Sequence, residues 1–407
     1  MKSRRSRARQ RRRERRRTRP PSALALPGLA RTAVADSPPA EPHSDYRYSR
    51  YAEDALRSSN VAAGGERDRY EIDIHQFRVE SGITDRIGVG IDLSHEAMSG
   101  ATPWYVTPDT NGDPVQVMTG ATIDEARTDV LVAGDYYYEL GKVTLSGGIS
   151  DENDYLAVNG GLGGERHFND KNTTLSGGVG LSYDQISPVD TERFPTRPEH
   201  ENKQSYNGYV ALSQVLGDST VAQTSLKYQH ARGFLSDPYK LAWVAGIPET
   251  DERPGTRNQF SSLTRLRHHF RALEGSLHLD YTFYADDWEL YSHTVELAWH
   301  QTLFDRFRLI PSVRYYSQSQ ADFYAPYYNV ARSDGLRSSD YRLSPFGAYS
   351  YRIQAEFPFE FWEFHWHVAA AFERYVSDAD VALESVSLAN PGLVSYNLFT
   401  VGLTARF

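Results

Sequence analysis

The sequence contains no cysteine among its 407 residues and only three methionines. Without cysteine the chain can form no disulfide, no thiolate metal site and no cysteine nucleophile. Its mean hydropathy is −0.57, and no apolar run reaches the roughly 18 residues that a membrane-spanning helix needs. A transmembrane helix is therefore excluded. A transmembrane β-barrel is not, because its apolar residues occupy only alternate positions of each strand.

Positive charge is scarce beyond the N-terminus. Residues 1–35 hold 13 Lys and Arg residues, and the remainder has 31 Lys and Arg against 52 Asp and Glu. A basic arm can bind nucleic acid, but this one precedes a strongly acidic chain, so we expect no nucleic-acid partner. The basic stretch, the apolar patch 23–30 and the Ala33-Val34-Ala35 pattern instead indicate a signal peptide over residues 1–35. Residues 36–43 are then a linker.

From residue 44 to residue 407 the apolar residues recur at every second position. In residues 87–93 and 277–283, for example, Ile, Val, Leu, Tyr or Phe alternates with Gly, Asp, His or Thr. Alternation of this kind gives each strand one apolar and one polar face. Many of these segments exceed the roughly 5–6 residues that are typical of soluble strands. Their length suits strands that cross a bilayer at a tilt.

The connections alternate between tight turns and long loops. Seven tight turns interleave with eight other connections, and the longest of these are the loops 55–68, 101–122, 188–202, 235–257, 325–340 and 378–392. The arrangement predicts an all-β fold, a transmembrane antiparallel β-barrel of about 16 strands over residues 44–407, with short periplasmic turns and longer outer loops. A sandwich of this size would be oversized, and no repeat of 40–50 residues supports a propeller.

The last strand places apolar residues on one face and ends in an aromatic residue. The residues of this face are Phe399, Val401, Leu403 and Phe407. The pattern resembles the C-terminal signature of bacterial outer-membrane barrels, which the barrel-assembly machinery reads. It predicts location in the Gram-negative outer membrane, with the lipid bilayer and that machinery as partners.

If the apolar faces contact lipid, the polar faces line the lumen. The lumen-lining candidates are Arg265, Arg267, His269, Arg271, Arg308, Arg314, Glu363, His365, His367 and Glu373. Two interpretations stay open. Either the barrel holds water and the arginine row steers small anions, or the charges pair across a narrow interior and plug it.

Sites for chemistry are few. His365 and His367 could together ligate a metal, but hydrogen-bonded lumen histidines are the simpler interpretation. No G-x-S-x-G or H-E-x-x-H motif is present. We therefore expect no enzyme, no catalytic residue, no metal and no cofactor.

Several segments resemble a proteobacterial family that is catalogued as domain of unknown function 3570. They are Met98–Trp104, Gly120–Asp129, Ser150–Tyr155, Phe194–Pro198, Gly233–Lys240 and Tyr315–Tyr324. The resemblance runs over nearly the whole chain from about residue 45, and it implies an outer-membrane barrel without an assigned ligand or activity. Asp124, Glu125, Arg127 and Asp129 fall at a loop-side strand end. They either order the loops through ion pairs or bind a ligand.

These observations favour a porin-like channel, or a binding barrel, for small polar or anionic solutes. The alternative is a closed barrel that acts as a scaffold for an envelope complex through loops 101–122 and 235–257. The family resemblance would link such a complex to flavin-transfer or thioredoxin-like proteins. A hydrolase embedded in the barrel is a third possibility, but the sequence offers no motif for it.

Overall fold

The computed structural model describes residues 37–304 and 306–407, and only the backbone of residues 120–124. The predicted signal peptide therefore lies outside the described residues. No helix in the described ranges is long and apolar enough to span a membrane. The helical elements are four 3-10 turns: η1 (Ser58–Asn60), η2 (Arg271–Leu273), η3 (Tyr341–Leu343) and η4 (Ala379–Val381).

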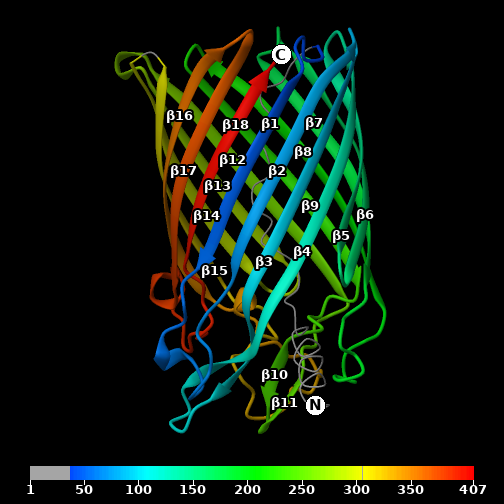
Figure 1. Ribbon diagram of the computed structural model, residues 1–407, viewed down its shortest axis with the longest axis vertical. Coiled ribbons are helices and arrows are strands. Elements are labelled where there is room, and N and C mark those ends of the chain that lie inside the picture. The colour runs from blue at the N-terminus through cyan, green and yellow to red at the C-terminus, as the bar shows by residue number, and fades with distance from the viewer. Residues whose placement is uncertain (1–36, 305) are drawn as a thin grey trace, which may run out of the picture.

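Sixteen antiparallel strands form a closed barrel in the described part of the chain (Figure 1). They are β1 (His43–Glu53), β2 (Glu71–Thr84), β3 (Ile87–Pro108), β4 (Pro114–Tyr138), β5 (Gly141–Glu152), β6 (Tyr155–Phe168), β7 (Thr173–Ile186), β8 (Glu201–Gly217), β9 (Thr220–Gly233), β12 (Thr256–Phe270), β13 (Gly275–Asp286), β14 (Tyr291–Leu303), β15 (Phe307–Gln318), β16 (Phe346–Phe361), β17 (Phe364–Asp378) and β18 (Tyr396–Arg406). Strands β1 and β18 pair and close the barrel. The predicted fold class and strand number are confirmed.

The two ends of the barrel differ, as the alternation of connections predicts. The short turns and the C-terminus lie at the upper end in Figure 1, and the long connections gather at the lower end. Strands β10 (Leu241–Val244) and β11 (Ile247–Thr250) form a separate hairpin within the connection from β9 to β12. This hairpin was not predicted from the sequence.

The two faces of the wall differ in the way that the period-two pattern predicts. On β5, exposed Val143, Leu145 and Ile149 alternate with less exposed Thr144 and Ser146. The outer face repeats this apolar character across the neighbouring strands, where Leu162 and Val179 are also exposed. Apolar side chains on the outside of a closed barrel have no protein partner, so lipid is the environment that suits them.

The prediction of a loop over residues 101–122 is wrong. Strands β3 and β4 continue through this segment as a paired hairpin as far as Pro108 and Pro114. Its apolar side chains are buried: Val106, Val115 and Met118 are at most 8% exposed. Met118 packs with Leu56, from the β1–β2 connection. The segment forms strands because other loops pack against its apolar side chains. Its proline, glycine and asparagine residues predicted a loop, because they carry no information about that packing.

Candidate functional site

The inner face of the wall brings together residues from neighbouring strands through the pairing register. Arg265 on β12 lies opposite Asp280 on β13, which lies opposite Glu296 on β14 and, through it, Arg314 on β15. In this part of the barrel the inner face thus carries a row of charges, with two carboxylates between two arginines. Residues that lie directly opposite each other on paired strands project from the same face of the sheet. Successive residues of one strand project from opposite faces.

Four of the predicted lumen arginines contact carboxylates. Arg265 lies 3.4 Å from Asp280, which Arg267 also contacts. Arg308 lies 3.1 Å from Glu356, and Arg314 lies 2.7 Å from Glu373. These contacts place the arginines in ion pairs along the wall instead of in a row of free cations.

The inner wall is nevertheless accessible to water. The side chains of Arg308 and Arg265 remain 52% and 43% exposed, although they lie on the inner face. A cavity lined by Arg267, His278, His300 and Glu356 opens on the same wall. The charged side chains in this part of the wall therefore leave space beside them.

The remaining predicted lumen residues lie nearer the short turns. His269 on β12 hydrogen-bonds Ser276, and His367 on β17 lies 3.4 Å from Glu356. Arg271 and Glu363 lie in turns, and Arg271 is 70% exposed beside Asp218. His365 is exposed beside Glu360. His365 and His367 thus share one face of β17, as the sequence predicted, whereas Glu363 lies in the turn before that strand.

The outer face of β18 carries the predicted assembly signal. Phe399, Leu403 and Phe407 are exposed, and Val401 lies on the same face. Phe407 also contacts the ring of Phe364 on β17. The closing strand thus presents an apolar surface on the outside of the barrel.

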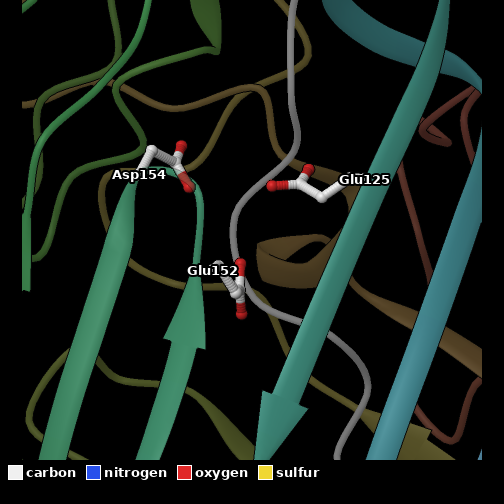
Figure 2. Close-up of side chains that lie close together, drawn as sticks. All are labelled: Glu125, Glu152 and Asp154. Atoms are coloured by element: carbon white, nitrogen blue, oxygen red, sulfur yellow. The ribbon is translucent and has the colours of Figure 1, made fainter.

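Part of the predicted loop-end cluster lies inside the barrel. Arg127 on β4 lies 2.9 Å from Asp129 and 3.6 Å from Glu152 on β5, so the ion pairs that were one of its two interpretations are present. The side chain of Asp124 lies outside the described residues. Figure 2 shows that Glu125, Glu152 and Asp154 turn toward one another, with carboxylate oxygens within 4.8 Å. These oxygens could face a cation, and Asp154 also accepts a hydrogen bond from Tyr239.

The connections at the loop end pack together into what we call the loop cap, comprising residues 54–70, 187–200, 234–255, 319–345 and 379–395. The β1–β2 connection meets the β17–β18 connection where Asn60 donates to the carbonyl of Pro391. The β17–β18 connection meets the β15–β16 connection where Asn390 donates to the hydroxyl of Tyr324. Loops from opposite ends of the sequence therefore support each other.

Tyr239, in the β9–β12 connection, links the cap to the other side of the barrel. Its hydroxyl accepts from the backbone N–H of Val189 and donates to Asp154, which lies between β5 and β6. The Arg197 guanidinium lies 4.8 Å from the centre of the Tyr239 ring. Trp288, between β13 and β14, packs against Phe323 of the cap. The β5–β6 and β13–β14 connections thus contact the cap as well.

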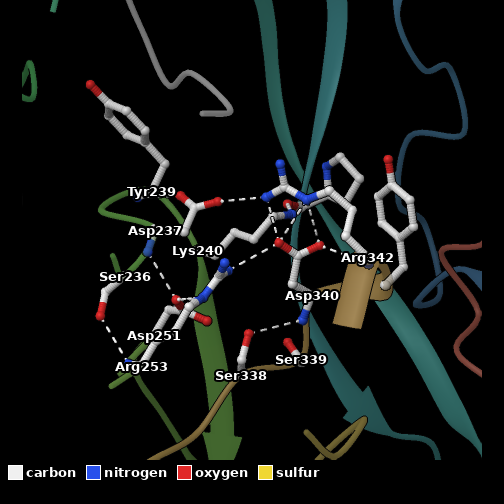
Figure 3. A network of polar contacts seen from close by, with 12 residues as sticks. Ser236, Asp237, Tyr239, Lys240, Asp251, Arg253, Ser338, Ser339, Asp340 and Arg342 are labelled. Atoms are coloured by element: carbon white, nitrogen blue, oxygen red, sulfur yellow. Dashed lines mark hydrogen bonds and ion pairs between the residues drawn. The ribbon is translucent and has the colours of Figure 1, made fainter. Parts of the chain in front are cut away.

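Six charged residues form the cap network, which ties the β9–β12 and β15–β16 connections together (Figure 3). They are Asp237, Lys240, Asp251, Arg253, Asp340 and Arg342. Arg253 lies 2.6 Å from Asp251 and 3.0 Å from Asp340. Arg342 contacts Asp340 and lies 3.2 Å from Asp237. Lys240 donates to the carbonyl of Pro103 on β3 at 3.2 Å. Three carboxylates therefore face three cations.

The carboxylates of the cap network are buried and differ in pKa. Burial raises the pKa of Asp237 to about 6, although Lys240, Arg342 and Arg253 oppose the shift. Burial alone would also raise the pKa of Asp340, but Arg342, Lys240 and Arg253 outweigh it and hold that pKa well below its usual range. Burial lowers the pKa of Lys240. Asp340 is thus the anionic centre of the network, whereas Asp237 is held less firmly in its charged form.

Three of the segments that carry the family resemblance come together at this cap. Asp237 and Lys240 belong to Gly233–Lys240, Asp154 belongs to Ser150–Tyr155, and Arg197 belongs to Phe194–Pro198. The sequence pattern predicted no site in these segments. Their convergence could not be read from one sequence, because nothing in it shows which loops meet.

A family model described as a protein of unknown function, DUF3570, matches residues 21–395. The chain belongs to this family. A search of curated proteins found no match for this DUF3570 barrel.

Solved structures resemble the DUF3570 barrel in fold. A bacterial polysaccharide outer membrane secretin has 9% identity and a TM-score of 0.45, with 89% of this chain and 98% of that chain covered. A loop-deletion mutant of OmpT, an outer membrane protein of Vibrio cholerae, has 9% identity and a TM-score of 0.42, with 90% and 98% covered. CdiB from Acinetobacter baumannii has 7% identity and a TM-score of 0.49; the match covers 89% of this chain but only 60% of CdiB.

Proposed function

We propose that this protein is an outer-membrane barrel that binds small polar solutes in its lumen and passes them, with the loop cap closing its outer end at rest. The observation that carries the proposal is the charged inner wall, on which Arg265 and Arg308 stay about half exposed. A wall of accessible charges suits hydrated solutes. Apolar residues on the outer face support residence in a bilayer, and the β18 surface supports assembly by the barrel machinery.

The cap is the reason to expect a gated passage. Ion pairs with buried carboxylates join loops that lie far apart in sequence, as between Asp237 and Arg342. Loops held in this way do not move freely, because exposing a buried charge without its partner is costly. Passage then requires that a solute, a partner or a change of conditions displaces the cap.

A closed scaffold for an envelope complex is the second candidate. The same cap network favours it, since a locked surface of loops could present a fixed docking face. The proposal for either function includes no catalytic step.

Conductance in planar bilayers separates the two candidates. We expect the refolded wild-type protein to show rare openings and the double variant Asp340→Asn, Arg342→Ala to show frequent, stable ion-permeable steps. Folding is checked beforehand by heat-modifiable migration on gels. Silence from both folded proteins would reject passage and favour the scaffold.

A further inference from the structure

Two arginines of the inner wall differ from those described above. Arg47 lies on β1 and Arg352 lies on β16, and neither forms an ion pair with any of the described residues. Among the described residues, Arg352 donates only to the side-chain amide oxygen of Gln354. By contrast, Arg308 and Arg314 each contact a glutamate.

The carboxylates nearest to Arg352 are already engaged. Glu373 lies directly opposite Arg352 in the register, but it accepts hydrogen bonds from Arg314 and Ser350. Glu356, four residues along β16, faces Arg308 and His367. This part of the wall therefore carries more cationic groups than its carboxylates contact.

Arg47 and Arg352 lie on the same inner face, with β17 and β18 between their strands. The register places Gly402 beside Arg47 and Ala369 beside Gly402. Ala371 and Thr400 form the adjacent pair. The side chains between the two arginines are thus short, and the row of Arg47 reaches β16 at Glu356, four residues from Arg352.

The two guanidinium groups act on each other across these short side chains. Arg352 repels Arg47 electrostatically, and Asp45, two residues from Arg47 on the same strand, partly offsets the repulsion. Asp45 itself accepts a hydrogen bond from Thr404 and lies 3.8 Å from His43. Like charges that are held near each other are costly, and an anion between them removes that cost.

We propose that Arg47 and Arg352 form a subsite for a small solute that carries an oxyanion, such as a carboxylate or a phosphate. Guanidinium groups bind such oxygens through paired, charge-assisted hydrogen bonds. This inference rests on the proposed function, since it names the solute class that the lumen would take. It also moves anion recognition away from the predicted row of Arg265, Arg267 and Arg271.

Equilibrium dialysis with inorganic phosphate tests the subsite in refolded protein at low chloride concentration. We expect saturable binding to the wild type and a dissociation constant raised about tenfold or more by the double variant Arg47→Gln, Arg352→Gln. Lys227→Gln is the matched control. It removes one exposed inner-face cation on β9, on another part of the wall, so we expect a change of less than about twofold.

The outcomes separate the subsite from the proposed function. No saturable binding by the wild type, an unchanged affinity in the double variant, or an equal loss in Lys227→Gln would each overturn the subsite. Phosphate binding that is lost only in the double variant supports it, even where bilayers stay silent and passage is rejected. Conductance without phosphate binding supports passage and overturns the subsite.

Discussion

The loop cap and the lumen use the same residue types in opposite ways. In the cap, the carboxylates of Asp251 and Asp340 are fully buried, and Arg253 is only 11% exposed. In the lumen, Arg265 and Arg308 contact carboxylates but stay about half exposed. Burial makes the cap pairs costly to break, whereas water screens the lumen pairs. The difference assigns positioning of the loops to the cap charges and contact with solutes to the lumen charges.

The largest expected effect comes from removing the anionic centre of the cap. Asp340→Asn leaves Arg253 and Arg342 without their shared carboxylate, which we expect to destabilise the cap by about 3–5 kcal/mol. Hydrogen exchange of backbone amides in residues 234–255 and 319–345 should then become roughly 100-fold faster or more. The matched control is Asp334→Asn, which breaks an exposed pair with Arg332 in the same connection. Equal exchange in both variants would show that the cap network does not hold the loops.

The two faces of a single strand give the next largest effect. Leu145, on the outer face of β5, is 67% exposed, so Leu145→Arg places a charge in lipid and should cost about 2–4 kcal/mol of folding free energy. Ser146→Arg changes the adjacent residue on the inner face and should cost much less, because water and carboxylates can meet the charge there. Denaturant titration of refolding, followed by heat-modifiable migration, measures both. A greater loss in Ser146→Arg would reverse the assignment of the faces.

The sequence predicts the wall well and the cap poorly, for a physical reason. Lipid outside and water inside impose a period of two on every strand, so residues such as Leu145 and Ser146 report their own environment. Asp237 and Arg342 meet although 105 residues separate them. No local pattern encodes such a contact. The same lack of local information explains why residues 101–122 looked like a loop, since their apolar side chains pack against Leu56 from another connection.

The lumen shows an intermediate case. Arg265, Arg267, Arg308 and Arg314 could be placed on polar faces from their spacing, and the structure puts them on the inner wall. Their carboxylate partners depend on strand register, which the sequence does not fix. For that reason the sequence emphasised a row of arginines, whereas the structure leaves Arg47 and Arg352 without ion pairs in the part that it describes.

The smallest of these effects concerns pH and distinguishes Asp237 from Asp340, two of the three buried carboxylates of the cap. The pKa of Asp340 is lowered from its ordinary value of 3.8, so this carboxylate stabilises the cap at pH values above 3.8. The contribution is lost as the pH falls through the pKa of the folded state. Asp237 has the opposite sign. Its pKa is raised to about 6, so its contribution is fully present below about 4 and is lost as the pH rises through 6.

Protection of the cap against hydrogen exchange should therefore be greatest near pH 4 and should fall by about 2–3 kcal/mol between pH 4 and pH 7. Asp237→Asn should remove this decline. Its amide oxygen can still accept from the backbone N–H of Tyr239, which lies 3.0 Å from the carboxylate, and no buried charge has to form. A wild-type protection factor that stays flat from pH 5 to pH 8 would contradict the raised pKa. A decline that persists in Asp237→Asn would assign the pH dependence to another group. These measurements test whether the cap is weakened by Asp237, the carboxylate whose ionised form burial disfavours.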